Sequence, residues 1–130
     1  PLKGDLAIPV IATKDIAKVA SECLLSLDFE GVSIRELLGQ RDMTMIEMTR
    51  ILGKAIGMDT LKYVQFSRED ARRSMLEAGL SPDVAKALLE LYHSINEGIL
   101  IAGAERTEDS TTATSFEEFA ETFSAVYSAG

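Results

Sequence analysis

The sequence is poor in cysteine, histidine and tryptophan, of which its 130 residues contain one, one and none. A single cysteine excludes an intrachain disulfide and gives no indication of an oxidising compartment. One cysteine and one histidine are too few for a Cys/His zinc site, so we expect no metal centre. No apolar run approaches the ~20 residues that a membrane-spanning helix needs. These absences predict a soluble, cytoplasmic chain without a membrane partner.

Basic residues are also scarce. Lysine and arginine number 13 against 21 aspartate and glutamate residues, which gives a formal net charge of −8. This sign opposes contact with a phosphate backbone, so we expect no nucleic-acid partner. Residues 105–130 hold six acidic side chains and one basic side chain. We interpret that end as a solvated face, with an acidic docking surface as the alternative.

The rest of the composition is typical of a folded protein. Hydrophobic residues make up 46% of the chain and charged residues 26%, which excludes intrinsic disorder and collagen. The length fits a single domain over residues 1–130. The chain begins at Pro1 and has no initiating methionine and no signal-peptide pattern. We therefore expect a processed or excised piece.

Hydrophobic periodicity predicts three short strands among five helices. Pro9 has no N–H to donate, so the first strand belongs at an edge. The second strand has a pattern that is also compatible with a short helix. Residues 103–114 are predicted to form an exposed loop. The strands are expected at 7–11, 32–38 and 62–66, and the helices at about 14–27, 44–57, 68–78, 82–99 and 115–127.

The predicted helices begin after hydroxyl residues, whose side chains can accept a hydrogen bond from a free backbone N–H. Thr44 and Ser115 are each followed three residues later by a glutamate, which is the pattern of a capping box. The expected N-caps are Thr13, Thr44, Ser67, Ser81 and Ser115.

Two helices carry strong apolar stripes that predict burial. In the first helix the stripe includes Cys23, which we interpret as a small buried residue rather than a reactive thiol. In the last helix we expect Phe119→Ala to cost ~3–5 kcal/mol. The five methionines are expected to fill the core, with a binding surface as the alternative. The stripes are Ile16, Val19, Ala20, Cys23, Leu24 and Leu27, and Phe116, Phe119, Ala120, Phe123, Val126 and Tyr127.

Motifs for catalysis are absent. The sequence has no Gly-x-Gly-x-x-Gly turn, no P-loop and no Gly-x-Ser-x-Gly elbow, so we assign no catalytic residue and no cofactor-binding residue. Acidic residues in the first helical turns are explained by the helix dipole. The residues alone do not make a complete enzyme, and we expect the isolated chain to lack measurable dinucleotide affinity because no Gly-rich turn precedes a helix.

Four stretches taken in order resemble a known family. The first is IPVIATKDIAKVASECLLS, and the second is GVSIRELLGQRDMTMIEMTRILGKAIG. The third is KYVQFSREDARRSMLEAGLSPDVAKALLELYHSINEG, and the last is TTATSFEEFAETF. Together they resemble the C-terminal half of NmrA-like proteins, which are atypical short-chain dehydrogenases/reductases. Some members reduce quinones or other small molecules with NAD(P)H, and others sense the dinucleotide.

The resemblance implies a helix-rich α/β fold, the C-terminal substrate-side part of a Rossmann-type architecture. It implies a small-molecule substrate, and it implies NAD(P)H only if an N-terminal half with the Gly-rich turn is present. Whether the chain belongs to an active enzyme stays open. The alternative is a stand-alone binding or oligomerisation module without redox chemistry. The substrate pocket implied by the third stretch consists of Met75, Tyr92, His93 and Asn96.

The resemblance also has a consequence for assembly, because this chain lacks the N-terminal half that carries most strands of the family fold. We expect residues 8–11 to pair with residues 63–66, which leaves the 32–38 strand without its usual neighbours. Unpaired backbone and apolar side chains on that strand would then favour pairing between chains. The predicted partner is a second copy of this chain, as a homo-oligomer, or the missing N-terminal half.

Overall fold

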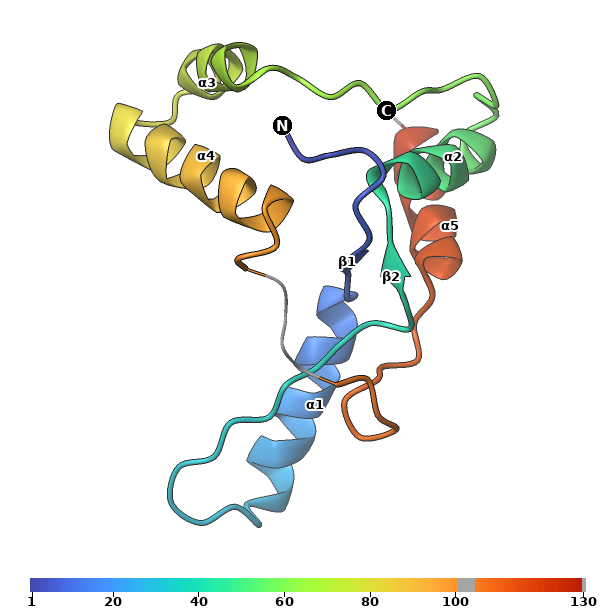
Figure 1. The fold of residues 1–130 in the computed structure, drawn as a ribbon. Coiled ribbons are helices and arrows are strands. Elements are labelled where there is room, and N and C mark those ends of the chain that lie inside the picture. Colours follow the sequence, from blue (N-terminus) through green and yellow to red (C-terminus); the bar gives the residue numbers. More distant parts are fainter. Residues whose placement is uncertain (101–104, 130) are drawn as a thin grey trace.

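The computed structural model describes residues 1–100 and 105–129. It is helix-rich, and the described residues contain five helices and one two-stranded sheet (Figure 1). The elements in chain order are β1 (Ile8–Pro9), α1 (Thr13–Ser26), β2 (Asp42–Met43), α2 (Met45–Ala55), α3 (Arg68–Glu77), α4 (Pro82–Asn96) and α5 (Phe116–Tyr127).

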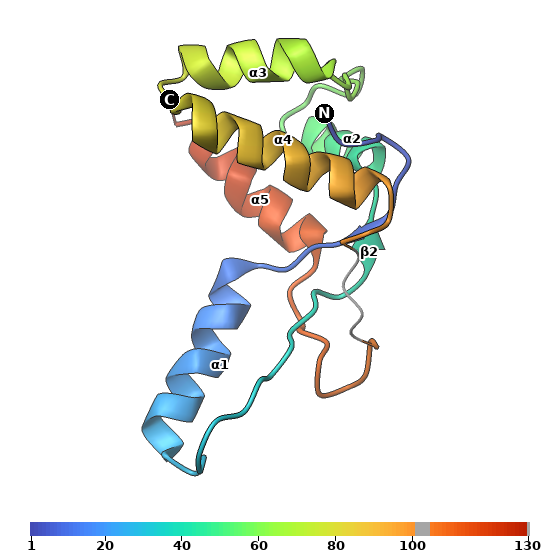
Figure 2. The same cartoon turned by 60° about the vertical axis from the view of Figure 1, so that its left-hand side comes forward.

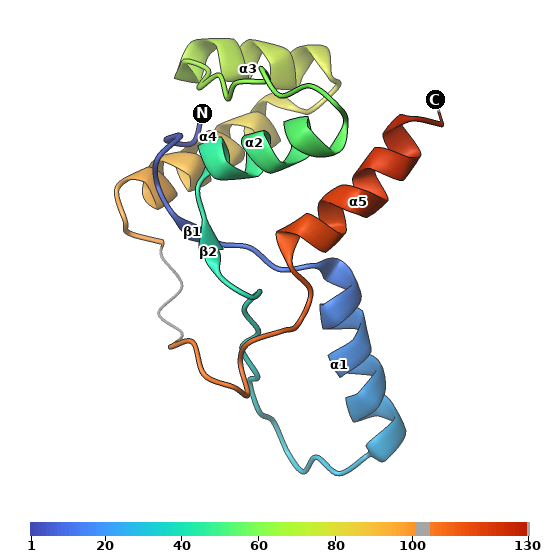
Figure 3. The same cartoon turned by 90° about the vertical axis from the view of Figure 1, so that its right-hand side faces the viewer.

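The helices form two pairs, with α2 packed against α5 and α3 packed against α4. Helix α1 extends away from both pairs, and the coil that follows it returns alongside it toward β2 (Figures 1–3). The N-terminal segment leads into β1, and β1 pairs with β2 in antiparallel orientation. This arrangement leaves α1 attached to the rest of the molecule mainly at its first turn.

The predicted helices are confirmed, and four of their five expected caps are present. The side chains of Thr44, Ser67, Ser81 and Ser115 each accept a hydrogen bond from the backbone N–H three residues later. Thr13 was the wrong residue for the first helix, because the N-cap position is Ala12, which has no side-chain acceptor. These caps can be predicted from the sequence because the two partners of each cap are only three residues apart.

The fourth helix ends earlier than expected. Its last residue is Asn96, and Gly98 follows in a left-handed conformation with φ of +70°. Ile99 therefore lies beyond the helix, where its N–H donates to the carbonyl of Ser94 over 2.9 Å. A glycine that reverses the chain in this way is a common helix terminator. Residues 105–114 of the predicted loop contain no helix, and residues 103 and 104 lie outside the described residues.

Two of the three predicted strands are wrong. Residues 61–67 are irregular, and within 32–38 only Leu38 pairs, through an isolated parallel bridge to Thr111. The short helix considered for 32–38 is not formed either. Val32 and Ile34 are 98% and 91% exposed, so these side chains have no described element to pack on, and only Leu38 at the end of the segment is buried.

The sheet pairing also differs from the expected one. Strand β1 pairs with β2, with Ile8 opposite Met43 and Pro9 opposite Asp42. The expected partner, residues 63–66, is instead attached to the N-terminal segment through the Tyr63 hydroxyl, which donates to the Leu2 carbonyl over 2.9 Å. This contact is a single side-chain hydrogen bond, and it does not align residues 63–66 with the N-terminal segment as a backbone ladder would.

The main core lies between β2, α2 and α5. Its buried residues are Met43, Met48, Ile51 and Ala120, and Phe116 packs against them from the start of α5. A smaller group of buried residues joins α3 and α4, and consists of Ala71, Ala85 and Leu89. The prediction that the methionines fill the core is confirmed only in part, because Met43 and Met48 are buried there whereas Met58 is exposed.

The two apolar stripes are less buried than predicted. No residue of α1 is buried, Cys23 is half-buried, and Leu24 is largely exposed. Phe119 in α5 is 45% exposed, so the cost predicted for a core Phe119→Ala exchange is too large. The periodicity is that of amphipathic helices, but α2 and β2 cover only part of the α5 face, and no described helix or strand covers the α1 face. All six acids in residues 105–129 are exposed, as predicted.

Candidate functional site

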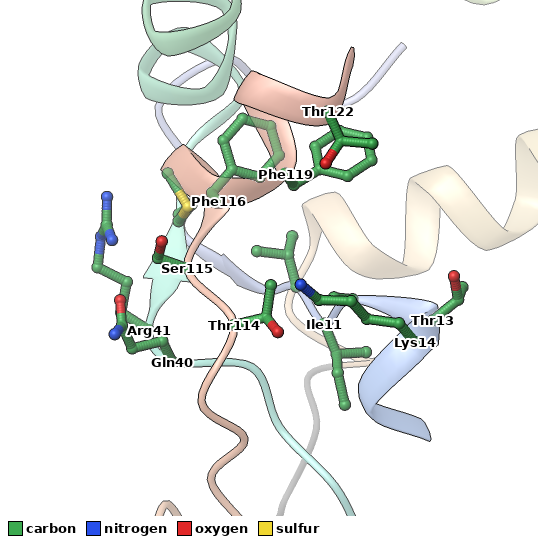
Figure 4. Close-up of a pocket in the computed structure, with 13 residues that line it drawn as sticks. Ile11, Thr13, Lys14, Gln40, Arg41, Thr114, Ser115, Phe116, Phe119 and Thr122 are labelled. Carbon is green, nitrogen blue, oxygen red and sulfur yellow. The ribbon is translucent and has the colours of Figure 1, made fainter. Parts of the chain in front are cut away.

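A cavity of about 390 Å³ lies where the start of α1, the segment before β2 and the start of α5 meet (Figure 4). Its walls come from three parts of the chain that are far apart in sequence. The lining residues are Val10, Ile11, Ala12, Thr13, Lys14, Gln40, Arg41, Met43, Thr114, Ser115, Phe116, Phe119 and Thr122.

One side of the cavity is apolar and aromatic. The rings of Phe116 and Phe119 lie 5.5 Å apart between centroids and are tilted by 44°. Val10, Ile11 and Met43 complete this surface. Tilted aromatic rings beside branched aliphatic groups offer a large contact area to a flat apolar molecule. The other lining side chains carry hydroxyl, amide, ammonium or guanidinium groups, which can fix the orientation of a ligand.

Gly39 brings two of the walls together. It is buried, and a Cβ at this position would overlap the carbonyl oxygen of Val10 and would lie 2.8 Å from the carbonyl carbon. The guanidinium of Arg106 donates to the Gly39 carbonyl and to the Asp42 carboxylate. The backbone approach therefore depends on the absence of a side chain.

Leu38 fixes the same segment from the other side. Its N–H donates to the Ser110 carbonyl over 2.6 Å, and its carbonyl accepts from the Thr112 N–H over 2.8 Å. These bonds hold the segment before β2 against the chain that leads into α5. Two of the cavity walls are thereby joined through backbone contacts.

Asp15 joins α1 to the entry of α5. Its carboxylate accepts from the Thr114 N–H over 3.1 Å and from the Thr114 hydroxyl over 2.7 Å. The hydroxyl bond from Thr114 is the main reason why the pKa of Asp15 is lowered. This contact closes the third side of the cavity.

Arg41 forms a fork between two helix starts. It donates to both carboxylate oxygens of Glu117, over 2.7 and 3.2 Å, and to Glu47 over 3.2 Å. The hydrogen bonds from Arg41 hold the pKa of Glu117 below its usual range. Because Glu47 faces Arg41, the capping box expected at Thr44 is only half formed, whereas the box at Ser115 is complete.

The contacts of Asp15 and Glu117 make the stability of the fold depend on pH in the acid range. Both carboxylates have a lower pKa in the folded state, so their contribution is present above their unfolded pKa values of ~4 and is lost as the pH falls through the folded values. We expect the melting temperature to be flat from about pH 7 to 5 and to fall below about pH 4. Thermal unfolding of wild type and of the double variant Asp15→Asn, Glu117→Gln measures this dependence. A double variant with an equally steep acid limb would contradict the assignment.

The four residues predicted for the substrate pocket lie elsewhere, and none of them lines this cavity. Tyr92, His93 and Asn96 are on α4, and Met75 is on α3. Tyr92 and Met75 are half-buried, and His93 is exposed. The pKa of the nearby Tyr63 is raised, mainly by burial and also by Tyr92.

Asn96 binds the N-terminal segment of the chain. Its side-chain oxygen accepts from the Lys3 N–H over 2.8 Å, and its amide donates to the Pro1 carbonyl over 3.0 Å. Its backbone carbonyl accepts from the Lys3 ammonium over 2.9 Å. The side-chain oxygen and amide of Asn96, which are predicted to face a substrate, therefore bind the N-terminal segment.

Sequence reasoning missed the lining residues of the cavity. Lys14 and Thr114 are separated by a hundred positions, and neither forms part of a catalytic or binding motif. The one local signal was Gly39, a glycine between apolar and polar residues that is not needed for a turn. A buried glycine of this kind indicates a close backbone approach, but it does not show which segment approaches.

The sequence matches no family model, and it has no significant match among curated proteins. No helix in the described part of the chain is long and apolar enough to cross a membrane. Within residues 1–100 and 105–129, no three His, Cys, Asp or Glu side chains are grouped so that they could hold a metal ion.

Proposed function

We propose that this chain is the substrate-side portion of an NmrA-like protein, and that its cavity binds a small molecule with a largely apolar body. The observation that carries the proposal is the cavity of about 390 Å³ with one aromatic side and a few polar groups on the other. This volume falls in the range of small-molecule sites, which are mostly apolar with a small number of orienting groups.

The resemblance agrees with this location only in part, because the third stretch, to which it assigns the substrate pocket, contributes no wall of the cavity. Three of the four stretches that resemble NmrA-like proteins contribute walls of the cavity, through residues 10–14, 40–43 and 114–122. In this proposal the helix-rich fold is the C-terminal part of a Rossmann-type architecture. The site is the cavity beside α1 and α5, and not the group formed by Met75, Tyr92, His93 and Asn96.

The residues of this chain do not fit a dinucleotide. Helix α1 is entered through Val10, Ile11 and Ala12, and each of these has a Cβ where a pyrophosphate would need a bare glycine backbone. If NAD(P)H takes part in the function, an N-terminal half outside this sequence holds it. This chain then contributes substrate binding, and we assign it no catalytic residue.

Binding of a neutral apolar probe tests the proposal. We expect N-phenyl-1-naphthylamine to bind with saturable fluorescence and one site per chain, and we expect Phe119→Ala to weaken it about 5-fold, since one aromatic contact contributes ~1 kcal/mol. Val126→Ala is the matched control, because Val126 is 71% exposed on the same helix as Phe119 and does not line the cavity. Equal losses in both variants, or no saturation, would contradict the cavity as the site.

A second candidate function is a binding or oligomerisation module. It is favoured by a set of exposed apolar side chains at the end of α1 and in the coil that follows, which we call the α1 patch. Several exposed large apolar side chains in one stretch of the chain are typical of an interface. The α1 patch consists of Leu24, Leu25, Leu27, Phe29, Val32 and Ile34.

We propose that the α1 patch is covered in solution by a second copy of this chain, or by an N-terminal half where one is present. Light scattering of the isolated chain at micromolar concentration should give at least twice 14.1 kDa. The variant Leu25→Asp, Val32→Asp should be monomeric and equally stable, because neither side chain contributes to the core. Val126→Asp, which alters an exposed position on α5, should not change the mass. A wild-type monomer would contradict self-association.

A further inference from the structure

We propose that the ligand of this cavity carries a negatively charged group that is bound by Lys14, so that the site takes an aromatic or otherwise flat apolar anion. The inference rests on the proposed small-molecule function and adds the charge of the ligand. It begins from the ionisable side chains that line the cavity. Only Lys14 and Arg41 do so, and both are basic, in a chain whose net charge is −8.

The two cations have different surroundings. The guanidinium of Arg41 is occupied by Glu117 and Glu47, so its charge is compensated within the protein. Among the described residues, no carboxylate lies within ion-pair distance of the Lys14 ammonium. In Figure 4, Arg41 lies at the left of the view and Lys14 at the right, and the two phenylalanine rings lie above them. Lys14 is therefore the cation that can bind a ligand.

The nearest acids are already satisfied by other partners. Asp15 accepts two hydrogen bonds from Thr114, and Glu118 accepts the Ser115 N–H over 2.8 Å in the capping box. Neither carboxylate lines the cavity. A ligand anion could therefore reach Lys14 without breaking an existing ion pair.

The start of α1 adds to the positive potential at this point. The N-cap Ala12 has no side-chain acceptor for the first N–H groups of the helix, and Ala12, Thr13 and Lys14 all line the cavity. Uncapped N–H groups at a helix N-terminus carry partial positive charge. A cationic ligand would meet two lining cations, and the nearest carboxylates, Asp15 and Glu118, already accept hydrogen bonds from Thr114 and Ser115, which disfavours it.

Two probes with the same ring system separate the charge from the apolar contact. 8-Anilinonaphthalene-1-sulfonate carries a sulfonate, and N-phenyl-1-naphthylamine is its neutral counterpart. Both are titrated in the Leu25→Asp, Val32→Asp background, which removes binding to the α1 patch. We expect Lys14→Gln to weaken the sulfonate probe about 10-fold and the neutral probe less than 2-fold, as for a lost charge-assisted hydrogen bond. Lys14→Arg should retain most of the affinity.

Lys18→Gln is the matched control. Lys18 lies one turn further along α1, is exposed, and does not line the cavity, so its exchange should change neither affinity. If both probes bind and Lys14→Gln leaves the ratio of their affinities unchanged, the anion inference is overturned and the cavity proposal stands. If only the sulfonate binds, and its binding depends on Lys14, the anion contact stands and the proposal that an apolar body is enough for binding fails. Failure of both probes to bind overturns both.

Discussion

Gly39→Ala should be the most damaging single exchange in this chain. A Cβ at Gly39 overlaps the carbonyl oxygen of Val10 and comes within 3.1 Å of the Ile11 Cα. These are backbone atoms, which cannot rotate away, so the segment before β2 must separate from the β1–α1 turn. We expect a loss of about 3 kcal/mol or more in the free energy of unfolding, the upper range for overpacking. Chemical unfolding followed by circular dichroism measures it.

Gly4→Ala is the matched control for this exchange. Its Cβ would lie 3.0 Å from the Tyr63 ring and 3.2 Å from Ile46, both flexible side-chain atoms. We expect a change of less than about 1 kcal/mol, because such neighbours can shift by the few tenths of an ångström required. If the two variants are equally stable, Gly39 is not in close contact with Val10.

Met43→Ala should have the next largest effect. Met43 is 1% exposed, and it lies in β2 where it contributes both to the core with α2 and α5 and to the wall of the cavity. Its removal leaves a void among Met48, Ile51 and Ala120. We expect a loss of about 3 kcal/mol in the free energy of unfolding, within the range for a buried methionine.

The same variant links stability to binding. Because the void adjoins the cavity, Met43→Ala should also alter the affinity for the neutral naphthylamine probe. Met58→Ala is the control, since Met58 is 44% exposed and lies outside both the core and the cavity. It should change neither property appreciably. Equal unfolding free energies for the two variants would contradict the core assigned here.

The exposed face of α1 gives the two proposals a common consequence. Lys14 and Asp15 at the start of α1 belong to the cavity and its rim, whereas Leu24 and Leu25 near its end belong to the α1 patch. A partner bound to the α1 patch therefore holds the same helix that forms one wall of the cavity. Assembly and ligand affinity should rise together if the partner makes α1 more rigid.

The candidate site could be predicted from the sequence only in fragments. The capping box at Ser115 marks the helix that carries Phe116 and Phe119, and both were named as an apolar face. Nothing in the local sequence relates them to Lys14 or to Gln40. Asn96 is predicted to face a substrate, and in the fold its side chain binds the chain's own N-terminal segment.

The sequence by itself determined where four of the five described helices begin, since each of Thr44, Ser67, Ser81 and Ser115 interacts with a backbone N–H only three residues away. Only the tertiary structure decided which strands exist and which apolar faces are covered. Residues 32–38 and 62–66 have strand-like patterns, but a strand needs a partner, and β2 became the partner of β1 instead. Strand pairing and burial depend on segments that are distant in the chain. A local pattern does not show whether those segments pack against it in the fold.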